Sequence, residues 1–205
     1  MMGRGLAAAA LAALLAGCAA AQSGSPEGWF AAHNGVPPRE SGRVSVCHGF
    51  GCHLKTAVGF SEADFRQMRR LVGTGGPAAE REGIRRMIAW AERRVAPVVG
   101  SQDDHPGLDI GLGHAGQAGQ MDCIDEASNT TSYLMVAARR GILRHHEVGR
   151  PVSRGFFLDG RYPHATAVIV DPDGTAWAVD SWPQRNGEKP DVMPLDEWFA
   201  ASPAS

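Results

Sequence analysis

The sequence predicts a protein of the α+β class, with helices in the first part of the chain and an antiparallel sheet in the second. Apolar residues recur at helical spacing in three segments between residues 61 and 140. Strand-like apolar runs follow, and the turn sequence DPDG, residues 171–174, joins two of them as a hairpin. With 205 residues, the chain is long enough for one domain with a sizeable core. Its net charge of -2 gives no electrostatic basis for binding nucleic acid or an anionic membrane surface.

Residues 1–18 have the pattern of a signal peptide. One arginine precedes an apolar run, residues 6–15, that is too short to span a bilayer as a mature helix. The run ends in LAGC, which resembles the lipobox of bacterial lipoproteins. This resemblance implies that Cys18 is lipidated and anchors the chain to the membrane, on the periplasmic face of the outer membrane. Ordinary signal cleavage near residues 20–21 is the alternative, and in both cases the mature chain lies where disulfides can form.

Residues 19–42 are rich in Ala, Gly, Ser and Pro, which predicts a flexible tether ahead of a single domain at residues 43–205. Residues 44–58, VSVCHGFGCHLKTAV, then predict a hairpin with HGFG as its turn. Cys47 and Cys52 flank this turn and are close enough in sequence to form a disulfide.

The same stretch leaves two alternatives to a disulfide open. Cys47, His48, Cys52 and His53 are all metal-type ligands, so a metal or haem site is one of them. Four ligands within seven residues would be cramped, and the C-x-x-x-x-C-H spacing departs from the C-x-x-C-H of haem attachment. Free thiols are the other alternative.

Two helices are expected before the central Gly-rich loop at residues 101–119. Ser61 is a candidate cap, with acids in the first turn and apolar residues at helical spacing behind it. A second helix should begin after Pro77 and stop at Pro97 or the residue before it, because proline cannot donate the helical hydrogen bond.

A third helix should begin at Cys123 and end before Gly141, since Ile124, Ala127, Thr131 and Leu134 form an apolar stripe. Strands are expected at residues 155–158, 164–170 and 175–182, and a short closing helix at residues 194–200.

Cys123 is the candidate nucleophile. If Cys18 is lipidated and Cys47 pairs with Cys52, Cys123 is the one cysteine left over. A helix N-terminus presents unpaired N–H groups and partial positive charge, which favour a thiolate and could stabilise an oxyanion. The carboxylate of Asp122 should raise the pKa of the thiol unless it points into the helix N–H groups. Asp125 is more consistent with an acid that interacts favourably with the helix dipole than with a catalytic group. The alternative for Cys123 is a small buried thiol that packs a helix start.

A cysteine nucleophile needs a base and an orienting acid. His164 opens an apolar strand, and Asp180 lies on the next strand across the turn at residues 171–174. The turn position makes His164 and Asp180 near cross-strand partners, within reach of a His–carboxylate hydrogen bond. A strand histidine bonded to a backbone carbonyl and a surface acid near a turn are the alternatives for these two residues.

The order of these motifs resembles the transglutaminase-like superfamily of papain-fold cysteine enzymes, which includes bacterial transglutaminase-like cysteine peptidases. Cys123-Ile124-Asp125 matches its Cys-x-Asp at a helix start, and Arg140-Gly141-Ile142 approximates the helix end. His164 and Asp180 follow in the family's order. The resemblance covers roughly residues 80–182. It implies a papain/transglutaminase-like fold, with N-terminal helices packed on an antiparallel sheet.

The resemblance also implies roles and a chemistry. Cys123 would be the nucleophile, His164 the base and then the acid, Asp180 the orienting group, and Gln117 or Gln120 an oxyanion donor. The expected reaction is acyl transfer from a peptide or isopeptide bond through a thioester, on a protein or peptide substrate of the cell envelope, with no cofactor. Two alternatives stay open: a catalytically inactive binding module of the envelope, and a haem- or metal-binding protein using residues 47–53.

Overall fold

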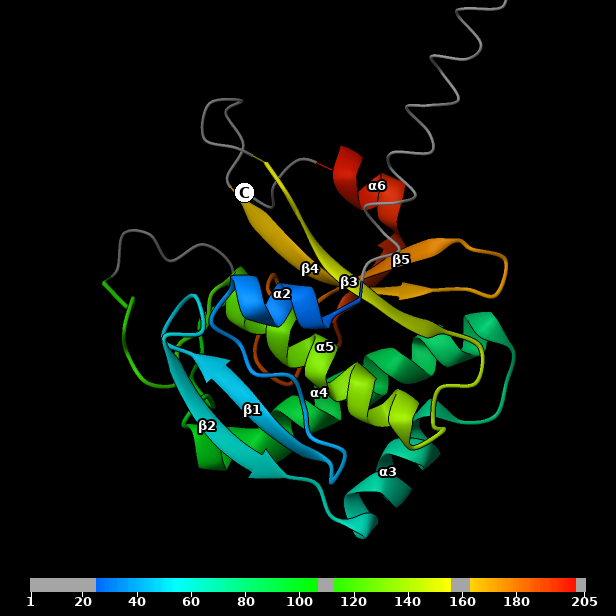
Figure 1. Cartoon of the computed structure of the whole chain (residues 1–205), viewed down its shortest axis with the longest axis horizontal. Coiled ribbons are helices and arrows are strands. Elements are labelled where there is room, and N and C mark those ends of the chain that lie inside the picture. Colours follow the sequence, from blue (N-terminus) through cyan, green and yellow to red (C-terminus); the bar gives the residue numbers. More distant parts are fainter. Residues whose placement is uncertain (1–24, 107–112, 156–162, 202–205) are drawn as a thin grey trace, which may run out of the picture.

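The computed structural model describes residues 25–106, 113–155 and 163–201, and within them the chain is α+β, as expected. Helix α5 (Cys123–Arg139) lies at the centre, between two antiparallel sheets (Figure 1). The smaller sheet pairs β1 (Arg43–His48) with β2 (Leu54–Gly59). The larger sheet has the strand order β3 (Glu147–Arg154), β4 (His164–Val170), β5 (Ala176–Asp180), β6 (Asp191–Pro194).

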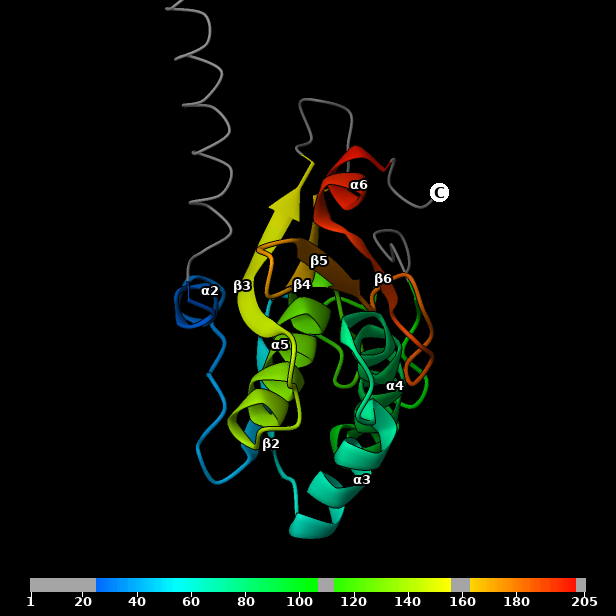
Figure 2. The ribbon, with the colours of Figure 1, turned by 90° about the vertical axis from the view of Figure 1, so that its right-hand side faces the viewer.

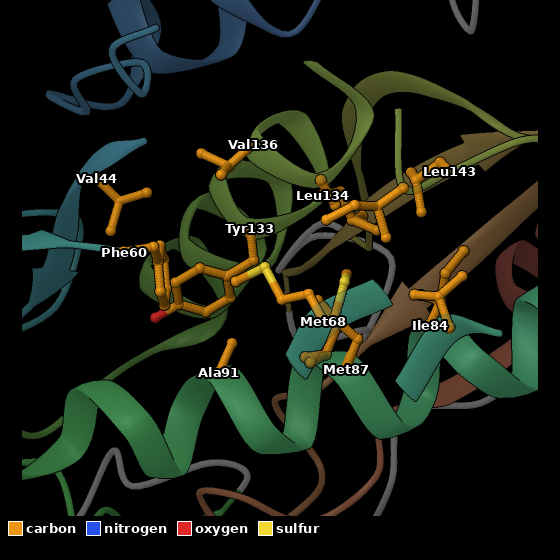
Figure 3. Packing of buried hydrophobic residues seen from close by; sticks show 14 of the residues in the cluster. Val44, Phe60, Met68, Ile84, Met87, Ala91, Tyr133, Leu134, Val136 and Leu143 are labelled. Carbon is orange, nitrogen blue, oxygen red and sulfur yellow. The ribbon is translucent and has the colours of Figure 1, made fainter. Parts of the chain in front are cut away.

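The main core is formed by α5, by α3 (Glu62–Val72) and by α4 (Pro77–Val99). Figure 3 shows Met87 and Ala91 of α4 facing Tyr133 of α5, with Met68 of α3 beside them. Helix α5 is buried on nearly every side, because both sheets and α4 pack around it. Such a helix is held rigidly by its surroundings, which suits a segment that carries a reactive side chain.

The larger sheet is covered on both faces. Ala167 and Ile169 of β4 point into the main core with α5, while Val168 packs with Leu195 and Trp198 on the other face. The last two residues belong to α6 (Leu195–Ala200), the short closing helix that the sequence predicts, and Figure 2 shows it beside β5 and β6. This alternation follows from the period-2 direction of strand side chains.

Helices α3 and α4 form where the sequence predicts them, except that α4 ends later than expected. Ser61 caps α3 in a complete capping box with Asp64. Helix α4 begins at Pro77 but continues past Pro97, so the predicted stop there is wrong. Pro97 lies in the last turn with its ring exposed, and the helix ends instead at left-handed Gly100, whose N–H donates to the carbonyl of Ala96.

Part of the expected tether is folded, which corrects the prediction for residues 19–42. Residues 27–32 form α2 (Glu27–Ala32), and Trp29 and Phe30 are buried. The indole N–H of Trp29 donates to Oγ of Ser128 on α5 at 2.9 Å. Two aromatic side chains bury enough apolar area to order a short segment whose composition otherwise resembles a linker. The packed part of the chain therefore begins well before residue 43.

Strand β3 was not predicted from the sequence, and it contains both Gly149 and Pro151. The pairing of β3 with β4 shifts register between Gly149 and Val152, and this bulge accommodates the proline. Gly155, the first residue of the strand expected at 155–158, is not in a strand, and residues 156–158 lie outside the described residues. The sequence also did not indicate β6.

The predicted signal peptide, residues 1–18, with its lipidation site at Cys18, lies outside the described residues. Within residues 25–106, 113–155 and 163–201, no helix has the length and apolar character needed to cross a membrane.

Candidate active site

The start of α5 is capped by Asp122, and its carboxylate does point into the helix. The side chain of Asp122 accepts the backbone N–H groups of Ile124 and Asp125, and Asp125 returns a bond to the N–H of Asp122. This is a complete capping box. It satisfies donors of the first turn that would otherwise be available to a thiolate or an oxyanion.

Asp125 also joins the helix to the turn between β1 and β2. Its carboxylate accepts the backbone N–H of Phe50 at 2.8 Å and that of Cys52 at 2.6 Å. Burial, followed by the charge of Asp122, raises the pKa of Asp125 to about 8, although three backbone N–H groups act in the opposite direction. Asp125, the acid of the Cys-x-Asp motif, therefore has a structural role. It anchors the turn between β1 and β2 through hydrogen bonds to Phe50 and Cys52.

The anchored loop is closed by the predicted disulfide between Cys47 and Cys52, which is confirmed. Phe50 and Cys52 have φ of 70° and 54°, in the left-handed region that residues with side chains rarely adopt. Asn129 of α5 brackets Cys47, accepting its N–H at 2.7 Å and donating to its carbonyl at 2.9 Å. Together these bonds bind the disulfide loop, residues 47–52, to the first two turns of α5.

The disulfide bears on the metal and haem alternatives for this stretch. Among the described residues, the one group that meets a metal-ligand geometry is Cys47, Cys52 and Asp125, and its two sulfurs are bonded to each other. His48 contacts Thr56 and Gly119 through its two ring nitrogens, and His53 is exposed. The four expected ligands are therefore occupied by protein contacts or face solvent.

Cys123, the first residue of α5, is buried, with 7% of its surface exposed. Its thiol donates to the carbonyl oxygen of Pro163 at 3.8 Å, and the backbone N–H of Ala165 also bonds to the sulfur. The sulfur thus contacts the backbone on both sides of His164. Burial, then the negative charge of Asp122 and of Asp180, raises the pKa of Cys123 to about 12. The resting group is a thiol, contrary to the thiolate expected from its place at a helix start.

His164 and Asp180 are joined by a buried hydrogen bond. Nε2 of His164 lies 2.6 Å from Oδ2 of Asp180, and each residue is 4% exposed. The expected register is shifted, because Ala167 pairs with Val179 and Val168 with Ala178. His164 and Asp180 are therefore diagonal neighbours on one face of the sheet rather than directly opposite residues. Diagonal pairs remain within reach of long side chains.

The bond to Asp180 assigns the two nitrogens of the imidazole. A carboxylate only accepts, so Nε2 carries the proton and Nδ1 is left as the basic nitrogen. Nδ1 is buried and has no hydrogen-bond partner among the described residues. Indole rings flank the imidazole, with Trp182 at 4.6 Å and Trp198 at 5.4 Å between ring centroids. Trp182 also packs in the same apolar cluster as Cys123.

The two glutamines proposed as oxyanion donors are bonded away from the thiol. The side-chain amide of Gln117 donates to the carbonyl of Gly113, within its own loop. That of Gln120 donates to the carbonyl of Asp103, and its oxygen lies 3.3 Å from Nδ1 of His105. Neither amide makes a hydrogen bond to Cys123 among the bonds of the described residues. The backbone N–H of Cys123 acts to lower the pKa of the thiol, but burial and the nearby acids outweigh it.

A polar network behind Asp180 was not indicated by the sequence. The hydroxyl of the next residue, Ser181, bonds Oγ1 of Thr130 at 2.8 Å and Oε2 of Glu126 at 3.1 Å. Glu126 is fully buried, and burial, then the charge of Glu92, raises its pKa. These bonds fasten the end of β5 to α5. Helical periodicity did not predict these hydrogen bonds. Polar side chains such as those of Glu126 and Thr130 are normally assigned to the solvent-facing side of a helix, whereas here both are buried.

Trp198 is the other contributor that sequence reasoning missed. Its indole N–H donates to Oδ2 of Asp180 at 2.8 Å, from a helix that was expected only to close the fold. A tryptophan in a short, otherwise mixed segment was the available signal, since a buried indole N–H usually has a specific acceptor.

No protein-family model, curated protein or solved structure matches this chain.

Proposed function

We propose that this chain is a cysteine acyl-transfer enzyme of the papain/transglutaminase-like type, acting on amide bonds through a thioester on Cys123. The observation that carries the proposal is the buried His164–Asp180 hydrogen bond, together with the contacts of the Cys123 sulfur to the backbone on both sides of His164. The order of the elements supports it: a helix that begins at the cysteine, then a strand that opens with the histidine, then a strand that ends at the aspartate. A second support is Nδ1 of His164, a buried basic nitrogen to which no donor of the described residues is bonded.

The first half of the reaction forms the thioester. His164 takes the thiol proton on Nδ1 as the sulfur of Cys123 attacks the amide carbonyl carbon, which gives a tetrahedral oxyanion. Asp180 stabilises the imidazolium through Nε2, as orienting carboxylates do in related triads. The imidazolium then protonates the leaving amine as the C–N bond breaks, so the proton that left sulfur departs with the amine.

The second half regenerates the enzyme. Water or a second amine gives a proton to Nδ1 of His164 and attacks the thioester carbon. The C–S bond then breaks, and the proton returns to the sulfur of Cys123. Attack by water is hydrolysis, and attack by an amine is transglutamination or amide exchange. Both outcomes use the same three side chains.

The raised pKa of Cys123 determines how the nucleophile is formed. A preformed thiolate–imidazolium pair would require the thiol to ionise at neutral pH, whereas here the buried thiol stays protonated. Proton transfer therefore accompanies attack, and the thiol must turn from the Pro163 carbonyl toward Nδ1. Catalytic hydrogen bonds that are long or misaligned without substrate commonly tighten in the substrate complex.

We further propose that the enzyme works in the bacterial cell envelope, anchored by lipid at Cys18, on protein or peptide substrates. The motif at residues 15–18 supports the anchor. The Cys47–Cys52 disulfide is consistent with an oxidising compartment.

The test combines acyl-transfer assays with matched variants. Purified protein is incubated with glutamine- and amide-containing peptides and a fluorescent primary amine, and both hydrolysis and amine incorporation are followed by mass spectrometry. Cys123→Ser and His164→Ala should abolish both, with a thioester adduct trapped on Cys123 in the wild type. His145→Ala, which removes an imidazole bonded to Gly75 instead, is the control and should keep activity. Turnover that survives Cys123→Ser would refute the proposal.

The burial of Cys123 favours a second candidate, a binding module of the envelope that keeps the fold without chemistry. In that case Cys123→Ser leaves the cellular role of the protein intact, whereas an enzyme loses it.

A further inference from the structure

Asp180 is held by two donors on the same oxygen. Oδ2 accepts from Nε2 of His164 at 2.6 Å and from the indole Nε1 of Trp198 at 2.8 Å. The other oxygen, Oδ1, is buried and has no hydrogen-bond partner among the described residues. The orientation of this carboxylate therefore depends on two bonds, and only one of them comes from the histidine.

Trp198 is itself immobilised by contacts from a different strand. It is 1% exposed and packs with Leu195 against the face of the sheet opposite α5. The guanidinium of Arg154 lies over its indole ring, 4.3 Å from the centroid, and donates to the carbonyls of Trp198 and Ala201. Arg154 is also the register partner of His164 on β3. The indole is thus fixed relative to the strand that carries the histidine.

We propose that Trp198 is a positioning residue of the candidate active site. Its indole N–H holds the carboxylate of Asp180 so that Nε2 of His164 stays bonded and Nδ1 remains the nitrogen that can accept the thiol proton. The inference rests on the proposed function for its purpose, but its physical content is the geometry of the Asp180–His164 pair. Helix α6 then contributes a side chain to the candidate active site, in addition to packing on the sheet.

The geometry explains why a second donor is useful. With His164 as its sole partner, a buried carboxylate could tilt about its Cβ–Cγ bond and follow movements of the imidazole. The indole N–H limits this tilt, because turning the carboxylate away from its present orientation would leave a buried donor without an acceptor. A fixed acceptor also fixes the imidazole plane, as the orienting group does in related triads.

Trp198→Phe tests this in the mature chain, because phenylalanine keeps an aromatic ring, although a smaller one, and has no N–H donor. Trp177→Phe is a matched control on β5: its indole N–H donates at the same 2.8 Å to a different aspartate, Asp171. The readout is the ¹⁵N-coupled proton signal of His164 Nε2–H in NMR spectra, which reports the bond to Asp180 without any substrate.

We expect Trp198→Phe to move this signal and to speed its exchange with solvent about tenfold or more, while Trp177→Phe leaves both unchanged. An Nε2–H signal with wild-type position and exchange in Trp198→Phe would overturn the inference and reduce Trp198 to a packing residue. If Trp198→Phe does not fold, Asp180→Asn provides the reciprocal measurement. The indole N–H signal of Trp198 must then move while that of Trp177 stays, and a Trp198 signal that does not move overturns the inference.

Activity separates this inference from the proposed function. In an active enzyme, Trp198→Phe lowers kcat with little change in KM, because the substrate contacts are unaltered. A wild-type protein without acyl transfer would refute the function, and the NMR comparison would still decide whether Trp198 positions the pair.

Discussion

The carboxylate of Asp125 accepts the backbone N–H of Cys52 at 2.6 Å, so the third residue of the catalytic-candidate helix is bound directly to the disulfide loop. The same carboxylate accepts the N–H of Phe50. Both donors come from residues with left-handed backbone conformations. The loop is therefore shaped around this one side chain, and the position of Cys123 depends on it.

Asp125→Asn should destabilise the fold. The amide keeps the shape of the carboxylate but has one acceptor oxygen, so its NH₂ group meets the N–H of Phe50 or Cys52 and leaves a buried donor unsatisfied. The expected loss is about 1–3 kcal/mol in the free energy of unfolding, measured by urea denaturation. Asp196→Asn, an exposed acid at the start of α6, is the control and should change stability by less than about 0.5 kcal/mol. Equal stabilities for wild type and Asp125→Asn would show that the loop holds its conformation without the acid.

The disulfide should contribute a further, separable part of the stability. Cys47→Ser with Cys52→Ser opens a loop of six residues, and the chain-entropy relation for that loop length gives about 2 kcal/mol. The bonds from Asn129 and Asp125 to the loop remain, so the variant should fold with reduced stability. Urea midpoints of the wild type with and without a reductant provide the second measurement, and Cys123→Ser is the control that keeps the disulfide. An oxidised wild type that is no more stable than the double serine variant would contradict this prediction.

Short-range signals predicted the segments that carry the candidate site. The cap at Ser61, the helix start at Cys123, the bounds of β4 and the Cys47–Cys52 pairing each depend on residues within a few positions of one another. Propensity and capping rules act at that range, which explains why they were sufficient.

The features that sequence reasoning missed depend on tertiary contacts. Helix α2 is ordered because Trp29 reaches α5, ninety-nine residues away in sequence. Strand β3 tolerates Pro151 because a bulge opposite β4 accommodates it, and the register of β4 with β5 places Asp180 diagonal to His164. The thiol is not a thiolate because burial and two acids outweigh the helix terminus, and burial cannot be read from the local pattern around Cys123.

Alkylation of Cys123 should follow its raised pKa. With a pKa of about 12, the thiolate fraction grows tenfold with each pH unit across the accessible range, so the rate with iodoacetamide should climb steadily up to about pH 10. At neutral pH it should be at least about tenfold slower than that of a small model thiol. Mass spectrometry of the modified peptide measures both rates, with the Cys123→Ser variant as the blank. A rate that reaches a plateau below pH 8 would instead indicate a preformed thiolate paired with His164.

Glu92 should make the stability of the fold fall as pH rises. Burial raises the pKa of Glu92 to about 8, partly offset by the N–H of Gly187 and the charge of Arg93. The folded state therefore keeps a proton between about pH 4.5 and 8 that the unfolded state has lost. Unfolding releases that proton, so stability decreases with increasing pH in this window, by about 1 kcal/mol per pH unit.

Glu92→Gln should remove the part of this dependence that Glu92 contributes, because glutamine is neutral at every pH and its oxygen can still accept the N–H of Gly187. Asp125 and Glu126, whose pKa values are also raised, keep their own contributions in the variant. The difference in the free energy of unfolding between variant and wild type should then grow in favour of the variant from pH 5 to pH 8, as measured by urea denaturation at each pH. Glu82→Gln, on the same helix but partly exposed and paired with Arg85 and Lys189, is the control and should run parallel to the wild type. Parallel curves for Glu92→Gln as well would mean that Glu92 is already ionised in the folded protein at pH 5, and that its buried oxygen finds a compensating charge.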